Sequence, residues 1–92
     1  MEEFTVYAIE SQVDKRLYVG FTKNLKNRIK EHNTGKTRST KGYRPWKLVF
    51  WQNFNNKKKA RKQEKYFKSG SGKEKLKELI RLHSSRDRTR VS

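Results

Sequence analysis

The sequence predicts an α+β fold in which helices flank a three-stranded antiparallel sheet. Three short segments rich in β-branched and aromatic residues alternate with polar segments of helical periodicity, in the order β-β-α-β-α-α. The 92 residues suit one domain with a modest core, to which 30% hydrophobic and 12% aromatic residues contribute. We expect this domain to span residues 1–83, and residues 84–92 to form a basic, flexible tail.

The first two strands are predicted at residues 4–9 and 16–21, with the sequences FTVYAI and RLYVGF. The polar residues between them favour a hairpin. A loop centred near residues 12–13 places Tyr7 opposite Tyr18, and directly opposed residues point to the same face of a sheet. The loop is longer than a two-residue turn, so the register stays open.

The first helix is predicted to begin after Thr22 or Asn24, either of which can cap it, and to run to about Asn33. Gly35 then ends it, because glycine readily adopts the left-handed conformation found after helices. Residues at helical spacing form its apolar face, namely Leu25, Ile29 and His32.

A basic loop is expected at residues 36–44, and Pro45 ends it. Residues 46–51, WKLVFW, form the third predicted strand, which is apolar enough to be the central one.

Two further helices complete the chain. One follows a cap at Asn55 or Asn56 and runs to about Lys68. Residues 69–72, SGSG, interrupt it, and the last helix covers residues 73–82. The apolar face of the last helix consists of Leu76, Leu79, Ile80 and His83.

The charge of the chain indicates a polyanionic partner. Lysine and arginine total 25 against 9 acidic residues, a formal net charge of +16. Such self-repulsion destabilises a small fold, and a nucleic acid relieves it while releasing the counterions of its phosphates. The alternatives are a charge that serves solubility, a protein that only coats RNA, and an anionic membrane surface, for which no amphipathic segment rich in Trp and Leu is found.

Residue types exclude other function classes. The chain has no cysteine, which rules out a disulfide framework, a thiolate zinc site and a cysteine nucleophile. Two histidines argue against a zinc site built from protein ligands alone. No apolar run approaches the length of a transmembrane helix, and the N-terminal residues lack a signal pattern, so we expect a soluble, cytoplasmic protein with no membrane partner.

Arg28 borders the apolar face of the first helix, where a surface cation is not expected. In one interpretation its stem lies along the sheet and its charge is in water. In the other, the planar guanidinium is held there to bind a phosphate. Helical periodicity leaves both open.

Glu64 is the one acidic residue in the most basic stretch of the chain, residues 57–68. It shares a helix face with Ala60 and Phe67, and a nucleic-acid coat gains nothing from a carboxylate that repels phosphate. Either it pairs with Lys68 at i+4, or it holds Mg²⁺ or Mn²⁺, whose preferred ligands are carboxylate, water and phosphate oxygens.

Tyr7, Tyr18 and His32 are candidates for the group that positions or deprotonates a water. A phenol has an ordinary pKa of about 10, so a tyrosine acts as a base at neutral pH only near positive charge. His32 has a better intrinsic pKa. The alternative is that the tyrosines are ordinary strand aromatics and that His32 is a buried, hydrogen-bonded helix residue.

In this order, the residues resemble the GIY-YIG endonuclease superfamily. The motifs are Thr5-Val6-Tyr7, Tyr18-Val19-Gly20, Arg28 with His32, and Glu64. The chain is most similar to small stand-alone members, which are similar to the incision domain at the N-terminus of the bacterial excision-repair subunit. The resemblance covers residues 4–82, and the stretches 33–36 and 43–49 contribute to it.

The resemblance implies the sheet and helices described above, and cleavage of phosphodiester bonds in DNA with one divalent cation, Mg²⁺ or Mn²⁺. Carried over by position, Tyr7 and Tyr18 would lie near the attacking water, and Arg28 would stabilise charge on the scissile phosphate. His32 would carry a proton or orient a neighbouring group, and Glu64 would bind the metal.

Four further residues are expected to contact the substrate, namely Gly20, Lys23, Lys41 and Tyr43. Gly20 would leave room for backbone or phosphate. Two positions depart from the family pattern. Thr5 stands where the first motif has glycine, and Phe21 stands where repair relatives carry a lysine that could lower a tyrosine pKa. Lys23, Lys26 or Lys41 could take that role.

We therefore predict a metal-dependent endonuclease that acts on DNA in repair or recombination, with RNA left open as a substrate and the oligomeric state left open. Its specificity would be low or structure-directed, because the chain has no second, sequence-reading domain. The alternative is a catalytically silent nucleic-acid-binding module that keeps the fold. Tyr7, Arg28 and Glu64 together favour the endonuclease, because a binding module has no use for Glu64.

Overall fold

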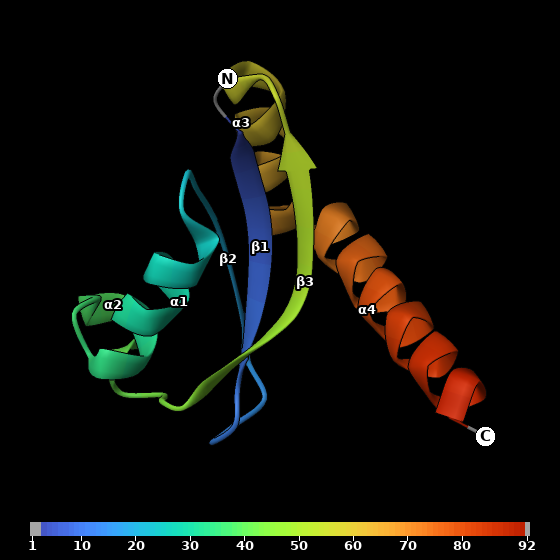
Figure 1. The fold of residues 1–92 in the computed structure, drawn as a ribbon, viewed down its shortest axis with the longest axis horizontal. Coiled ribbons are helices and arrows are strands. Elements are labelled where there is room, and N and C mark those ends of the chain that lie inside the picture. Colours follow the sequence, from blue (N-terminus) through green and yellow to red (C-terminus); the bar gives the residue numbers. More distant parts are fainter. Residues whose placement is uncertain (1–2, 92) are drawn as a thin grey trace.

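The computed structural model describes the backbone of residues 3–91 and the side chains of residues 3–82. A sheet separates two pairs of helices (Figure 1). The elements in chain order are β1 (Phe4–Ser11), β2 (Leu17–Thr22), α1 (Leu25–Thr34), α2 (Arg38–Lys41), β3 (Trp46–Phe54), α3 (Lys57–Lys68) and α4 (Gly70–Val91). All strand pairs are antiparallel, so the predicted α+β fold class is confirmed.

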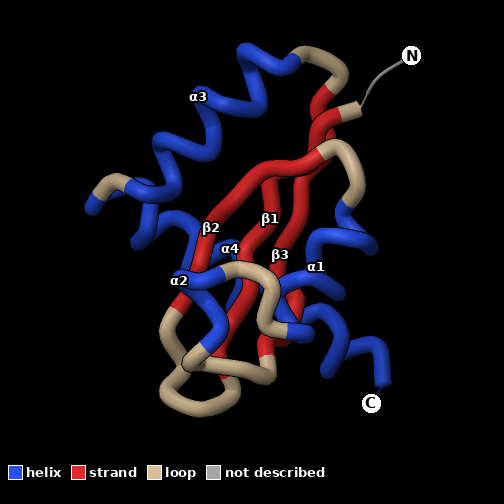
Figure 2. The backbone as a smooth tube through the Cα atoms, turned by 90° about the vertical axis from the view of Figure 1, so that its left-hand side faces the viewer, coloured by secondary structure: helices blue, strands red, loops and turns tan. Residues whose placement is uncertain are grey.

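β1 lies at the centre of the sheet, whose strand order is β2-β1-β3 (Figure 2). The prediction that the third strand is central is wrong, because β3 pairs with β1 alone. Nearly all of β1 is buried, whereas β3 is partly exposed and its Trp51 is 50% exposed. Apolar composition does not distinguish an edge strand that packs against helices from a strand with neighbours at both edges.

The β1–β2 hairpin has a different register from the predicted one. Tyr7 lies opposite Gly20, and Tyr18 lies opposite Ile9, so the predicted pairing of the two tyrosines is wrong. The loop is centred one residue later than expected, and Lys15 adopts a positive φ of 67° within it. The shift moves the partner of Tyr7 by two positions, which preserves the face of the sheet, so both tyrosines still point the same way.

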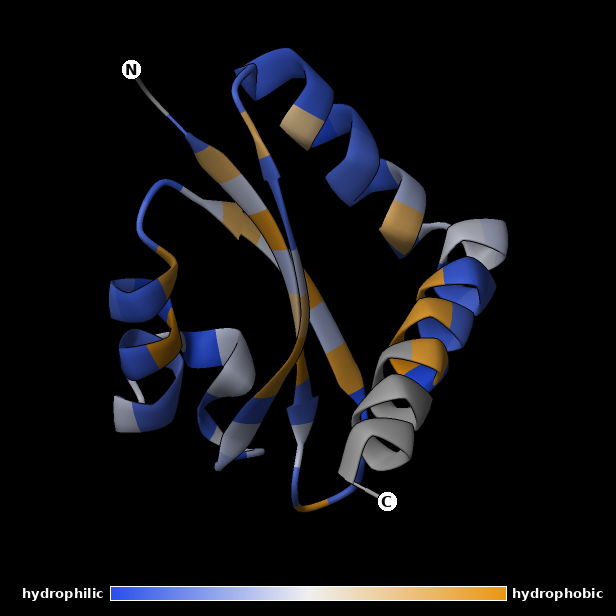
Figure 3. Ribbon diagram, turned by 45° about the vertical axis from the view of Figure 1, so that its right-hand side comes forward, coloured by the Kyte–Doolittle hydropathy of each residue, from blue (hydrophilic) through white to orange (hydrophobic). Residues whose placement is uncertain are grey.

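Alternate residues of β1 point to opposite faces of the sheet and enter two different cores. On one face, Phe4, Val6 and Ala8 pack in a cluster that includes Phe67 of α3 and Leu76 of α4. We call this the α3–α4 face. Figure 3 shows the apolar residues of both helices on the sides turned towards the sheet.

On the other face, Tyr7 and Ile9 pack with Trp46. Leu25 and Ile29 of α1 cover this cluster, as their spacing predicted. We call this the α1–α2 face.

Side chains cap the two helices that flank the site. Asn24 rather than Thr22 caps α1, where its Oδ1 accepts a hydrogen bond from the backbone N–H of Asn27 at 3.1 Å. Gly35 ends α1 in the predicted left-handed conformation, with φ of 84°. Asn56 caps α3 in the same way as Asn24 caps α1.

Two segments differ from their predictions. The expected loop at residues 36–44 contains the short helix α2. α4 begins at Gly70 rather than at residue 73, and a side chain at Gly72 would collide with the backbone of Tyr66, so glycine permits the close junction of α3 and α4.

The backbone of α4 continues to Val91, through the predicted tail. The side chain of His83, predicted on its apolar face, lies outside the described residues, and the flexibility of the tail stays a prediction. In the described part of the chain, no helix combines the length and the apolar character that spanning a bilayer requires.

Candidate active site

Three aromatic rings meet beneath α1 on the α1–α2 face. The ring centroids of Tyr7 and Tyr18 are 6.5 Å apart, and the His32 ring lies 5.8 Å from Tyr7 and 5.0 Å from Tyr18. β1, β2 and α1 therefore each supply one of the three residues predicted to handle the water. The structure brings together all three.

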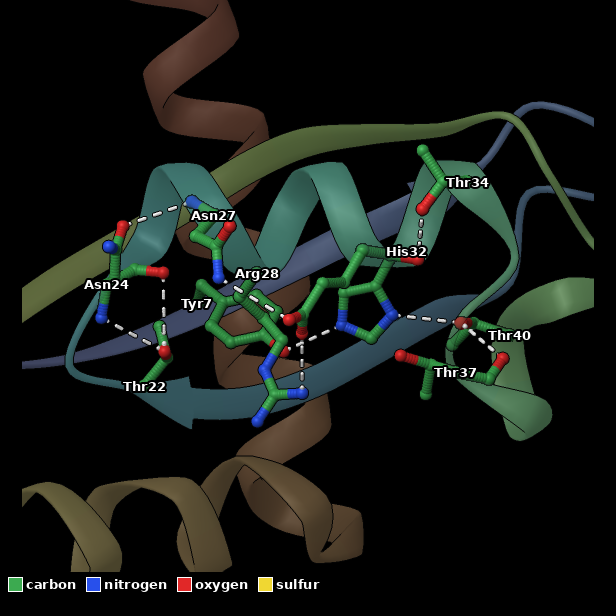
Figure 4. A network of polar contacts seen from close by, with 10 residues as sticks. Tyr7, Thr22, Asn24, Asn27, Arg28, His32, Thr34, Thr37 and Thr40 are labelled. Carbon is green, nitrogen blue, oxygen red and sulfur yellow. Dashed lines mark hydrogen bonds and ion pairs between the residues drawn. The ribbon is translucent and has the colours of Figure 1, made fainter.

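A chain of hydrogen bonds links Tyr7 to α2 (Figure 4). The Tyr7 hydroxyl lies 2.8 Å from His32 Nε2, and His32 Nδ1 lies 2.9 Å from Thr40 Oγ1. The exposed fractions are 2% for Tyr7, 1% for His32 and 0% for Thr40. Buried polar groups are stable when they are paired, and every buried side-chain nitrogen and oxygen in the described residues has a partner.

Burial shifts the pKa values of this pair in opposite directions. It raises the pKa of Tyr7 above its ordinary range, and the Tyr18, Glu64 and Glu31 side chains raise it further, while the Arg28 charge opposes the rise. Burial also lowers the pKa of His32, and the Arg28 charge adds to this effect. Both groups are therefore neutral at pH 7.

Arg28 lies at the rim of this pair. Its guanidinium Nη1 is 3.1 Å from Oε1 of Glu31, and its side chain remains 42% exposed. Asn27 Nδ2 donates to the other oxygen of Glu31 at 3.4 Å. The guanidinium thus has one restrained side and one side open to solvent, as the first interpretation of Arg28 expects, and its binding of a phosphate stays a prediction.

Glu64 lies on α3, whose Ala60 and Phe67 pack against β1 and β2. The Arg61 guanidinium lies 5.7 Å from the ring of Phe21 on β2, and Gln63 Nε2 donates to Gln52 on β3 at 3.4 Å. Glu64, three residues after Arg61, lies next to it on the helix surface. The Glu64 charge contributes to the raised pKa of the Tyr7 phenol.

The Glu64 carboxylate also has the partner that its helical spacing predicted. Lys68 Nζ lies 3.1 Å from Glu64 Oε2, and the Glu64 side chain is 16% exposed. Residues 3–82 contain no cluster of three or more His, Asp or Glu side chains that could hold a metal on its own. A single hard carboxylate fits Mg²⁺ or Mn²⁺, which keep most of their water and take phosphate oxygens as further ligands.

Gly20 makes a close approach, but to Tyr7. A Cβ atom at position 20 would lie 2.6 Å from the Tyr7 hydroxyl oxygen and 2.8 Å from Cζ. Only glycine leaves the phenol in its place over β2. Contact of Gly20 with substrate backbone or phosphate stays a prediction.

The other predicted substrate contacts have protein neighbours. Lys23 Nζ lies 5.7 Å from the Phe4 ring, and the Tyr43 ring stacks 3.7 Å from the Arg16 guanidinium. Lys41 is exposed on α2. Their contacts with substrate stay predictions.

Phe21, which stands where repair relatives carry a lysine, points to the opposite face from Tyr7. Its ring lies 6.2 Å from that of Phe4. This residue therefore belongs to the core of the α3–α4 face.

Two polar residues of the site were missed in the sequence. The signal for Glu31 was its i, i+3 spacing from Arg28. Thr40 carried no signal, because a threonine in a basic loop is ordinary and its partner His32 is known only from the fold.

Comparisons with known proteins identify the family of the chain. A family model described as the GIY-YIG catalytic domain matches residues 3–77. A UPF0213 protein of Clostridium perfringens is 42% identical over 72 residues, covering 77% of this chain and 76% of that protein. One of Syntrophus aciditrophicus is 39% identical over 88 residues, covering 94% and 99%. The solution NMR structure of a UPF0213 protein from Bacillus halodurans matches with a TM-score of 0.54 and 35% identity over 84% of both chains.

Proposed function

This chain belongs to the GIY-YIG family, as a small single-domain UPF0213 protein, and on that premise we propose that it is a metal-dependent endonuclease that hydrolyses phosphodiester bonds in DNA. The observation that supports the proposal is the buried Tyr7–His32 hydrogen bond of 2.8 Å, together with the charges of Arg28 and Glu64, which both act on the Tyr7 phenol. A fold kept only for binding does not require this combination. Low or structure-directed specificity and a role in DNA repair or recombination complete the proposal.

Each of these residues has its own role in the proposed hydrolysis. The open side of the Arg28 guanidinium binds a non-bridging oxygen of the scissile phosphate and stabilises the charge that develops there. Tyr7 and Tyr18 hold the attacking water through their hydroxyl oxygens. Glu64 would hold the divalent cation, which would supply further positive charge at the phosphate.

The basic surface of α3 supports a polyanionic substrate. Six residues of this helix and its cap line a shallow groove on its outer side: Asn56, Lys58, Lys59, Arg61, Lys62 and Lys65. Five of the six are cations, and their helix also carries Glu64. Substrate backbone bound there would contact the same helix that carries Glu64.

The Lys68–Glu64 ion pair is the one observation that favours a silent binding module, because it offers the carboxylate a partner without any metal. Cleavage assays separate the two functions. Labelled duplex, flapped, branched and single-stranded DNA, with an RNA control, would be incubated with Mg²⁺ or Mn²⁺ and with EDTA.

We expect the wild type to cut at least one DNA structure in metal and none in EDTA. Glu64→Gln keeps the size of the side chain, and we expect it to cut at least about 100-fold more slowly while binding the same DNA. Lys68→Gln removes the partner but not the ligand, and should retain cleavage. Equal cleavage by the wild type and Glu64→Gln would contradict the proposed endonuclease function.

A further inference from the structure

The buried hydrogen-bond chain from Tyr7 to α2 ends on a group that can only accept. Thr40 Oγ1 donates to the backbone carbonyl of Thr37 at 3.3 Å, and the Thr40 backbone N–H donates to the same carbonyl at 3.2 Å. Trp46 Nε1–H donates to the Thr40 carbonyl at 2.8 Å and holds α2 against the start of β3. The hydroxyl of Thr40 is therefore held by the Thr37 carbonyl, and the Thr40 backbone is held by Trp46.

The direction of every bond in the chain follows from proton counting. A hydroxyl has one proton, so a Thr40 hydroxyl that donates to Thr37 must accept from His32. His32 then carries its proton on Nδ1, and its Nε2 has only a lone pair. The bond at 2.8 Å from Nε2 consequently has Tyr7 as its donor.

We propose that Thr40 is a positioning residue that fixes His32 in the Nδ1-protonated tautomer, so that Tyr7 donates its proton inwards and presents its oxygen lone pairs to the attacking water. The last part of this statement, on the water, rests on the proposed function. The tautomer and the direction of the Tyr7 hydroxyl do not. In the opposite arrangement, His32 would donate from Nε2 to Tyr7 and occupy a lone pair that the water needs.

The Tyr7 hydroxyl packs against β2, where a Cβ atom at Gly20 would stand 2.6 Å from its oxygen. Four ionisable groups act on the pair from three elements: Tyr18 of β2, Arg28 and Glu31 of α1, and Glu64 of α3. Burial keeps the His32 ring neutral at pH 7, so it carries a single proton whose position matters.

Nuclear magnetic resonance reads the tautomer directly. In protein with ¹⁵N-labelled histidine, long-range proton–nitrogen spectra show which ring nitrogen carries the proton. His83→Gln, which removes the other histidine, assigns the His32 signals. We expect a protonated Nδ1 and an unprotonated Nε2 for His32 at pH 7.5, without metal or DNA.

Variants of Thr40 test its part in the effect. Thr40→Val replaces the hydroxyl by a methyl group of equal size, and we expect the His32 proton to move towards Nε2. Thr40→Ser keeps the hydroxyl and should restore the wild-type spectrum. On a DNA that the wild type cuts, Thr40→Val should lower kcat by about 10-fold with KM little changed, and Thr40→Ser should recover most of the loss.

A wild-type spectrum with the proton on Nε2 would overturn the proposal, even if Thr40→Val does not fold. An unchanged His32 tautomer in folded Thr40→Val would also overturn it. If the tautomer is as expected but the wild type cuts no nucleic acid, the proposed function fails and the assignment of Thr40 to the tautomer stands.

Discussion

The two faces of the sheet are stabilised by different interactions, although β1 contributes side chains to both. On the α3–α4 face, Phe4, Val6 and Ala8 meet other apolar side chains, and the burial of apolar surface is the main source of stability. On the α1–α2 face, Tyr7 is buried as completely but ends in a hydroxyl whose partner, His32, lies 25 residues further along the chain. The first face tolerates approximate packing, whereas the second requires particular atoms at particular distances.

The largest loss of stability is expected where the apolar face is opened. Phe67 is 1% exposed, and its ring meets that of Phe50 at 5.6 Å and 90°. Phe67→Ala should lower the free energy of unfolding by about 3–5 kcal/mol, measured by urea denaturation. The neighbouring Tyr66→Ala, at an exposed position, is the matched control and should cost much less. Similar losses for the two would mean that α3 does not pack through Phe67.

A smaller loss is expected from closing the space above Gly20. The added methyl of Gly20→Ala meets the Tyr7 phenol, and we expect a loss of about 1–3 kcal/mol in the free energy of unfolding. Gly42→Ala is the control, because no atom lies within 4 Å of its added methyl. If Gly20→Ala and Gly42→Ala both lower the thermal unfolding temperature only slightly, the Tyr7 ring moves aside without a loss of stability.

The α1–α2 face should also make the free energy of unfolding depend on pH. Burial lowers the pKa of His32 below its ordinary value of about 6.5, so the unfolded chain binds this proton more readily than the folded chain. Stability should therefore fall as the pH drops from that value towards the folded pKa, by at most about 1.4 kcal/mol per pH unit.

Urea denaturation between pH 8 and pH 5 checks this dependence. We expect His32→Gln to lose it and His83→Gln to keep it. If the free energies of unfolding of the wild type and His32→Gln change with pH in the same way, the effect does not originate in His32.

The smallest effect on stability is expected on the outer surface of the helices, away from both faces. Three lysines of α3 are exchanged for glutamine in one variant: Lys58, Lys62 and Lys65. We expect a change in unfolding free energy within about 0.5 kcal/mol. The affinity for DNA should fall, and the slope of its logarithm against that of the salt concentration should decrease by up to about 3.

The matched control exchanges three lysines of α4, namely Lys73, Lys75 and Lys77. Two of them pair with acidic neighbours of the same helix, Lys75 with Glu78 at 3.5 Å and Lys77 with Glu74 at 4.0 Å. We expect a smaller loss of affinity from this variant. Equal losses would mean that the DNA is attracted by overall charge and not by α3.

Sequence periodicity predicted the α3–α4 face better than the α1–α2 face. The spacing of apolar residues identified every strand, and candidate caps limited the start of α1 to Thr22 or Asn24 and that of α3 to Asn55 or Asn56. The order of the strands could not be predicted, because β1 and β3 are both apolar and only pairing makes β1 central.

The site was predictable only in part for a related reason. Tyr7, Arg28, His32 and Glu64 were named because they form an ordered motif. The fold brings Tyr7 and His32 into contact, and the charges of Arg28 and Glu64 act on the Tyr7 phenol. The register of the hairpin depended on where a five-residue loop turns, which local sequence does not determine. Thr40 belongs to the site because it contacts His32 where α2 packs against α1, and no local sequence pattern predicts this contact.

The contact between Tyr7 and Gly20 has an evolutionary consequence. Since one position can gain atoms only if the other loses them, the two residues form a coupled pair across neighbouring strands. A lineage that enlarges residue 20 first passes through a strained intermediate, whereas one that first shrinks residue 7 passes through a cavity and loses the partner of His32. Both paths are blocked at the first step, so the pair is expected to be inherited together or replaced together.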